Sequence, residues 1–311
     1  LEKERANLSE KQKILFLDNV HYGIDQLLES GLVLYGDPTT KYVEKVTENL
    51  LKNNSKLKKE LQFFVIKSNV ANALSTDQGI IFVTLGLLSQ LENEAQLAYV
   101  LSHEIAHYQE KHIERSYTEE VESREVLTYD QRITKLSNHS KEKEFEADKL
   151  GIKMYHSAGY AKSELLSAFD VLMYSYLPFD EVKLQLDYFN NELLFIPESM
   201  FPEEINKILV DENYDDNKSS HPNIRKRKDA VRDALEDYSN WETANYLLSE
   251  EEFKQIRTLA RFESVRIDLL NSNYGDVLYS LFLLEREYPN NLFLSRCKGQ
   301  AWLGLASRKI D

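Results

Sequence analysis

The sequence predicts an α+β protein that is mostly α-helical and carries one small β-sheet. Only 10 Gly and 6 Pro occur among its 311 residues, which favours long helices with few tight turns. Two short runs rich in aromatic and β-branched residues, 63–66 and 80–84, are typical of strands. Apolar residues make up 42% of the chain, enough for a real core, and much of the rest shows helical spacing.

The chain before the first strand is predicted to form scaffold helices over residues 8–34 and 37–51, the second one capped at the turn Asp37-Pro38. The turn-like segment 75–79 then leads into the second strand. A small sheet at this place would be able to present 80–84 as an edge strand to an extended peptide. The alternative, which explains the two strands equally well, is that they only pack in the core. The candidate substrate-binding residues are Ile80, Ile81, Phe82 and Val83.

The next helix carries His103-Glu104-Ile105-Ala106-His107, an H-E-x-x-H sequence, and is predicted to start at the cap Asn93. Positions four apart share a helix face, so both imidazoles reach one point and suit Zn²⁺. Glu104 falls in the apolar sector of this helix, where a carboxylate without a polar partner is unfavourable. An ordinary amphipathic helix with two histidines is the alternative. The pattern favours a zinc site with Glu104 as the proton acceptor.

A later helix, predicted over residues 144–155, supplies two acidic residues four positions apart, Glu144 and Asp148. Since a zinc hydrolase needs three protein ligands, one carboxylate is able to bind the metal while the other accepts a hydrogen bond from a ligand imidazole. The charged segment 114–143 is predicted to be a solvated helix or loop. His112 and His139 are interpreted as surface residues.

These motifs resemble the M48 family of metallopeptidases. The resemblance rests on the H-E-x-x-H helix, on Glu144 to Asp148 in an E-x-x-x-D frame, on residues 72–88 before the helix, and on Ser220-His221-Pro222 with Arg227. It extends over about residues 37–234 and implies a zincin-type catalytic domain that binds one Zn²⁺.

Matched position by position, the resemblance implies roles for seven residues. The metal ligands would be His103, His107 and Glu144, with Glu104 as general base and Asp148 as partner of a ligand imidazole. His221 would face the metal and act in catalysis or close the site, and Arg227 would hold a substrate carbonyl or stabilise the local fold. A loop histidine beside a proline is the alternative for His221.

The C-terminal part changes in composition to helices without catalytic residue types, over 262–273, 276–288 and a third helix that ends near residue 307. This region resembles a tetratricopeptide-like unit, too short for a free solenoid. We therefore expect a catalytic domain over 1–236 and a helical region over 237–311, which packs on that domain or binds a protein partner.

Charge and composition limit the remaining possibilities. A net charge of −14 argues against nucleic acid as the main partner, and no apolar run is long enough for a transmembrane segment. The single cysteine excludes an intrachain disulfide. Membrane-embedded members of the family carry spanning helices, so the chain resembles the soluble branch, and the resemblance implies an extracytoplasmic place, periplasmic or envelope-associated.

The sequence thus predicts a zinc-dependent endopeptidase that acts on protein or peptide substrates. By resemblance, the substrates would be damaged or misassembled proteins, which is protein quality control. The alternative is a latent or inactive zinc-site protein that serves as a chaperone-like or adaptor module through its C-terminal helices, with His221 held at the metal.

Overall fold

The structure is a computed structural model, in which the chain forms two compact units. The residues that it describes are 10–112, 141–175, 185–190, 195–200, 224–239, 241 and 244–307. The first unit comprises 1–175 and 215–260, and the second comprises 176–214 and 261–311. This grouping by packing does not decide where a functional domain ends, so the predicted boundary at residue 236 stays a prediction.

The predicted α+β class with a small sheet is confirmed. The sheet, in the first unit, has the strand order β1-β2-β4-β3. Its strands are β1 (Val33–Leu34), β2 (Gln62–Ile66), β3 (Ala73–Ser75) and β4 (Ile80–Thr84). β2 and β4 are parallel, whereas β1 and β3 run antiparallel to their neighbours.

The expectation that 80–84 forms an edge strand is wrong. Phe82 is paired with Phe64 of β2 on one side and with Leu74 of β3 on the other, so β4 is central. The residues named as substrate-binding, Ile80, Ile81, Phe82 and Val83, are all buried. Because both rows of backbone groups of β4 serve the sheet, this strand offers no free edge to a peptide.

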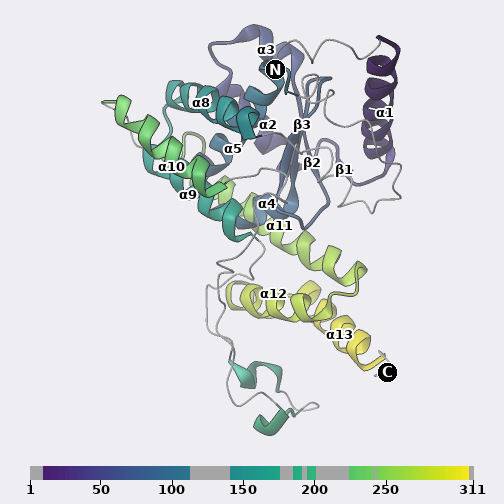
Figure 1. Ribbon diagram of the computed structural model, residues 1–311. Coiled ribbons are helices and arrows are strands. Elements are labelled where there is room, and N and C mark those ends of the chain that lie inside the picture. The colour runs from purple at the N-terminus through teal and green to yellow at the C-terminus, as the bar shows by residue number, and fades with distance from the viewer. Residues whose placement is uncertain are drawn as a thin grey trace. The chain divides into compact units, whose positions relative to one another are not determined.

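Helices cover both faces of the sheet, which explains why every residue of β4 is buried. On one side, Ile24 and Leu27 of α1 (Glu10–Glu29) pack against Ile66, Leu74 and Phe82. On the other side lie α2 (Pro38–Leu50) and α5 (Glu94–Gln109), as Figure 1 shows. The short helices α3 (Ser55–Glu60) and α4 (Leu85–Gln90) connect these layers.

Helix α5 begins where the capping pattern predicts. The Asn93 side chain accepts a hydrogen bond from the Gln96 amide at 3.0 Å, and the Gln96 side chain accepts one from the Glu92 amide at 2.8 Å. The first bond satisfies an amide that a helix start leaves without a helical partner, and the second ties the residue before the cap to the first turn.

The first turn of α5 is also fastened by a buried carboxylate. Glu94 accepts hydrogen bonds from the hydroxyls of Tyr42 and Tyr160, each at 2.7 Å, and from the amides of Leu247 and Leu248. A carboxylate at a helix N-terminus also interacts favourably with the helix dipole. The start of α5 is therefore tied to three other parts of the first unit.

The remaining helices of this unit pack beside α5. They are α8 (Lys141–Ala158), α9 (Lys162–Tyr174) and α10 (Ile224–Ala234). α8 lies close to α5, because a Cβ atom added at Gly151 would stand 3.3 Å from the Cα atom of His103. The absence of a side chain at Gly151 thus permits the close packing of two helices that the sequence predicts to carry the site.

The C-terminal region is helical, as predicted. α11 (Glu250–Leu270) passes from the first unit into the second, which also contains α12 (Tyr274–Glu287) and α13 (Leu292–Ser307). The core of the second unit includes Val265, Val277, Leu281, Leu294 and the buried Cys297. In the part of the chain that the structure describes, no helix is both long and apolar enough to cross a membrane.

We predict that Gly86→Ala destabilises the first unit. A Cβ atom at Gly86 would stand 2.3 Å from the carbonyl oxygen of Asn69, which is backbone and has little freedom to move. We expect a loss of about 1–3 kcal/mol in the free energy of unfolding, measured by chemical denaturation. Gly23→Ala is the control, because that helical position has open space and alanine favours a helix. Equal stability of the two variants would contradict the close approach at Gly86.

Candidate metal centre

Three predicted ligands converge at the contact between α5 and α8. The Nε2 atoms of His103 and His107 lie 2.9 Å apart, and they stand 3.4 and 3.3 Å from the two carboxylate oxygens of Glu144. One ligand atom from each residue lies within 4.8 Å of the others, and all three residues are buried. Two imidazole nitrogens and one carboxylate oxygen are a donor set of catalytic zinc sites, so these residues fit a Zn²⁺ ion.

Glu104 follows His103 on α5 and is only 1% exposed. The sequence predicts this burial from the apolar sector of the helix. A carboxylate at such depth is unfavourable unless polar groups or a cation lie nearby. The paired histidines on the same helix provide that setting, which is consistent with a part in chemistry for Glu104.

Asp148 lies one turn after Glu144 on α8 and collects several donors. Its carboxylate stands 2.9 Å from Nδ1 of His103, accepts a hydrogen bond from the Tyr99 hydroxyl at 3.0 Å, and is paired with the Arg227 guanidinium. A proton on Nδ1 of His103 leaves Nε2 with its lone pair directed toward the ligand cluster. Asp148 therefore stands where a partner of a ligand imidazole is expected.

Arg227 is a buried cation that contacts the acidic members of this network. It comes from α10, is 1% exposed, and donates from Nε and Nη2 to the two oxygens of Asp148, each at 2.7 Å. Its Nη1 forms an ion pair with Glu144, and the guanidinium lies over the ring of Phe169 at 5.4 Å. Of the two roles predicted for Arg227, these contacts favour stabilisation of the local fold over a contact with substrate.

The charges of the cluster shift the pKa values of its members. Burial would raise the pKa of Asp148, but the adjacent Arg227 outweighs it and lowers the pKa to about 2. Burial and Arg227 would lower the pKa of His103, but Asp148 and Glu144 outweigh them and raise it to about 9. Burial and the Asp148 carboxylate raise the pKa of Tyr99, which stays a neutral donor. Asp148 is therefore held as a carboxylate.

His112 is not the surface residue that the sequence suggested. It is fully buried, and its Nδ1 atom stands 2.8 Å from Nδ1 of His107. Its Nε2 atom stands 3.1 Å from an Oε2 atom of Glu146, a residue that lies between Glu144 and Asp148 in the sequence and does not join the ligand cluster. Sequence reasoning missed this pair because α5 ends at Gln109, and helical spacing no longer applies beyond it.

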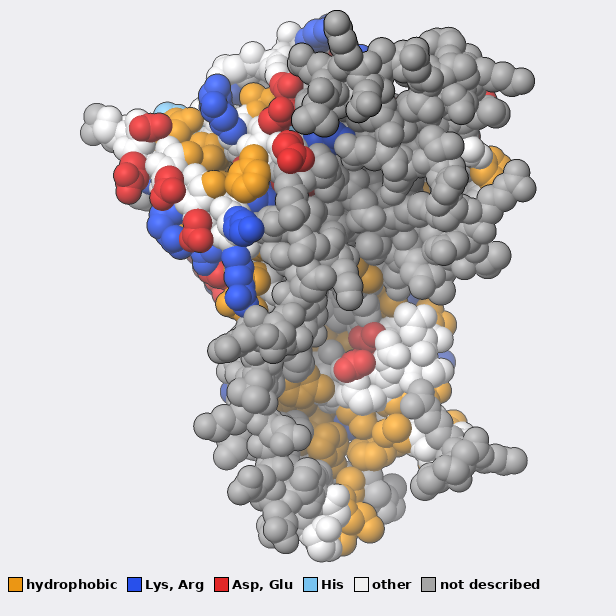
Figure 2. All heavy atoms as spheres, viewed as in Figure 1, with side chains coloured by type: hydrophobic (Ala, Val, Ile, Leu, Met, Phe, Trp, Pro, Cys, Tyr) orange, Lys and Arg blue, Asp and Glu red, His pale blue; other side chains and the backbone are white. Residues whose placement is uncertain are grey.

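His221 and His139 lie outside the described residues, so the predicted place of His221 at the metal stays a prediction. The basic run Arg225-Lys226-Arg227-Lys228 lies at the start of α10, and the acidic residues Asp229 and Asp233 follow it along the same helix. Figure 2 shows Lys and Arg interspersed with Asp and Glu on this face, and Arg232 is paired with Asp229 at 2.6 Å. Arg225 and Lys226 are exposed, whereas Lys228 is partly buried and paired with Asp170.

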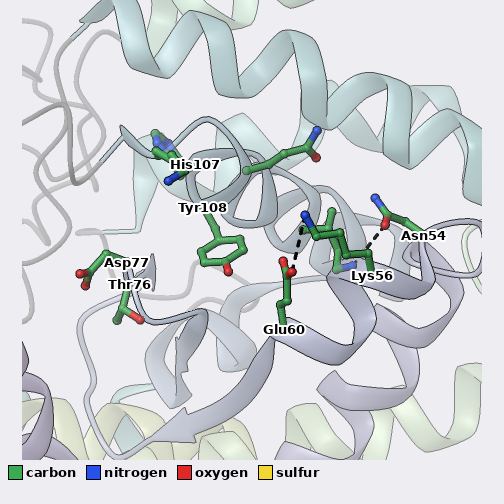
Figure 3. A pocket seen from close by; sticks show the side chains of 10 residues that line it. Asn54, Lys56, Glu60, Thr76, Asp77, His107 and Tyr108 are labelled. Atoms are coloured by element: carbon green, nitrogen blue, oxygen red, sulfur yellow. Dashed lines mark hydrogen bonds and ion pairs between the residues drawn. The ribbon is translucent and has the colours of Figure 1, made fainter.

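A polar cavity of about 340 Å³ adjoins His107. It lies between α3, the turn after β3 and the end of α5 (Figure 3). Tyr108 projects into it between Thr76 on one side and Glu60 on the other. Its volume is at the lower end of the range of small-molecule pockets, so the proposed ligand His107 has open space beside it.

Part of the chain matches a known protein family. Residues 37–129 match the model of peptidase family M48, a range that includes the H-E-x-x-H helix and ends before Glu144. The motif resemblance over 130–234 therefore rests on the residues quoted for it and on the geometry.

Curated relatives match about a third of this chain. A beta-barrel assembly-enhancing protease of Yersinia pestis is 26% identical over 115 residues, 37% of this chain and 23% of that protein. The protein of that name in Escherichia coli (strain K12) is 28% identical over 102 residues, 33% of this chain and 21% of that protein. A putative one of Vibrio cholerae is 28% identical over 96 residues, 30% and 20% of the two chains. The alignments thus span between 20% and 23% of the length of these relatives.

We predict that Arg227→Met strongly destabilises the first unit. The substitution leaves the carboxylates of Asp148 and Glu144 buried without their common cation, which costs about 3–5 kcal/mol in the free energy of unfolding. Arg232→Met on the exposed side of the same helix is the matched control and should change the stability by less than about 0.5 kcal/mol. Denaturant unfolding of both variants, without added metal, measures the difference. Similar small losses in both would mean that Arg227 does not bind the carboxylates as described.

Proposed function

We propose that this chain, whose residues 37–129 match peptidase family M48, is a zinc-dependent endopeptidase that hydrolyses peptide bonds of protein or peptide substrates. The observation that carries the proposal is the convergence of His103, His107 and Glu144 within 4.8 Å in a buried cluster, with Glu104 on the same helix. One Zn²⁺ per chain would be held by these three residues.

The chemistry divides between the ion and the side chains. When bound, Zn²⁺ supplies polarisation of a substrate carbonyl and lowers the pKa of water. Glu104 takes the proton of the attacking water and returns it to the leaving amine, which is general base and then general acid catalysis. Asp148 accepts the Nδ1 proton of His103 in a hydrogen bond and so orients that ligand.

Arg227 contributes charge balance in this proposal. Asp148 and Glu144 are two buried carboxylates, and one guanidinium contacts both. It offsets part of their negative charge and, by its hydrogen bonds, keeps the Asp148 oxygens directed at His103. Arg227 is thus proposed to act on the ligands and not on the substrate.

The biological setting is proposed from the relatives. These relatives are named beta-barrel assembly-enhancing proteases. By analogy we propose a role in quality control of envelope proteins, and therefore an extracytoplasmic, periplasmic or envelope-associated place. The helices α12 and α13 are proposed to bind a protein partner.

We predict that Glu104→Gln retains zinc and loses hydrolysis. Glutamine keeps the size of the side chain but does not accept the proton, so cleavage of an unfolded protein such as casein should fall by about 10²–10⁴-fold. Metal analysis of the purified variant should still give one zinc per chain. Glu110→Gln, at the exposed end of the same helix, is the control and should cleave as the wild type does. Wild-type cleavage by Glu104→Gln would exclude the mechanism.

His221 distinguishes an active enzyme from a latent one. If His221 assists catalysis, His221→Ala should lower the rate of cleavage of the same substrate by at least about 10²-fold, the lower range for an acid–base group. If His221 instead closes the metal site, the same substitution should raise the rate. Zinc content measured beside the rate separates both effects from loss of the ion. An unchanged rate would remove His221 from the proposed site.

A further inference from the structure

The two ligand histidines are held by different partners. His103 is oriented by Asp148, as described above. His107 is instead contacted by the buried His112, whose ring lies at a centroid distance of 4.8 Å and nearly perpendicular, at 73°. The Nδ1 atoms of the two rings stand 2.8 Å apart.

The chain is turned sharply to bring His112 to this place. Lys111, the residue before it, has a φ of 54°, in the left-handed region that residues other than glycine rarely adopt. The amides of Glu110 and Lys111 donate to the carbonyls of Ala106 and Tyr108, at 2.9 and 3.0 Å, and thereby close the end of α5. The turn directs the chain back toward the helix, and the His112 ring comes to lie against His107.

Binding of the ion through Nε2 of His107 would assign a proton to one nitrogen of each ring in these contacts. A ligand imidazole that binds through Nε2 carries its proton on Nδ1, so His107 donates from Nδ1 and His112 must accept with Nδ1. A neutral His112 then carries its proton on Nε2 and donates it to Oε2 of Glu146 at 3.1 Å. The Glu146 side chain is 46% exposed, whereas that of His112 is fully buried. A carboxylate near solvent thus fixes the tautomer of a buried ring beside the ligand.

We propose that His112, oriented by Glu146, is a positioning residue for the metal ligand His107. The inference rests on the proposed function in one respect, that His107 binds the ion through Nε2. It adds that the relay from Glu146 through His112 holds the His107 ring in its metal-binding tautomer and orientation. The relay raises the affinity for zinc without any contact between His112 and the ion.

The test compares two substitutions of His112 in the full chain. Asparagine places its Oδ1 atom where histidine has Nδ1, and so retains an acceptor for His107, whereas leucine fills similar space without one. Zinc affinity is measured by competition with a chromophoric chelator. We expect His112→Leu to weaken zinc binding by about 10–100-fold and His112→Asn to restore most of that loss. Nitrogen NMR of the histidine rings should show a proton on Nδ1 of His107 in the wild type and in His112→Asn.

Glu146→Gln adds an independent arm that leaves the buried ring in place. It should weaken zinc binding by a smaller factor than His112→Leu, and His112 should then populate both neutral tautomers. Glu142 is an exposed carboxylate on the same helix, and Glu142→Gln should leave the zinc affinity and the His112 tautomer unchanged. The melting temperature of each metal-free variant reports general damage to the fold.

Equal weakening by leucine and asparagine would overturn the proposal, because packing alone would then explain the loss. So would wild-type affinity in His112→Leu. Should that variant not fold, His112→Asn and Glu146→Gln still decide: wild-type zinc affinity and His112 tautomer in Glu146→Gln would contradict the relay. Zinc affinity does not depend on cleavage, so a wild type that binds zinc and cleaves nothing would contradict the proposed function and leave this inference intact.

Discussion

The close packing of α5 against α8 is the constraint on which the candidate site depends. α5 supplies both histidines, and α8 supplies Glu144 and Asp148, so the distances between donors are set by how near the two helices approach. Gly151 permits that approach, since a Cβ atom added there would stand 3.3 Å from the Cα atom of His103. A small residue at one point of a helix contact thus determines whether an imidazole and a carboxylate come within reach of one ion.

Charge balance is the second requirement of so dense a cluster. Two buried carboxylates repel each other unless a cation compensates them, and Arg227 contacts both. Arg227 is buried because it shares a face of α10 with the other buried residues of that helix, Ile224 and Val231. The guanidinium therefore lies on the apolar face of α10 and contacts the two carboxylates of the candidate metal centre.

How much of this was accessible from the sequence differs from residue to residue. The convergence of the proposed ligands was predictable because helical spacing places His103 and His107 on one face and puts Glu144 and Asp148 on another. The choice of Glu144 over Asp148 as the third ligand came from the family resemblance. The burial of Arg227 was concealed by the basic run around it, although its spacing from Ile224 indicates the apolar face. The central place of β4 was not predictable, since an apolar strand of five residues looks the same at the centre of a sheet as at its edge. His112 follows a left-handed residue, where no periodic pattern applies.

The carboxylate of Glu94 links the start of α5 to residues far along the chain. Two of its donors are backbone amides at positions 247 and 248, beyond the last helix that touches the ligands. A fragment that stopped at residue 236 would lose both amides and leave a charged group in the interior with tyrosine hydroxyls alone. The part of the chain that supports α5 therefore extends past the residues of the proposed site, because the buried start of that helix is completed by the amides of Leu247 and Leu248.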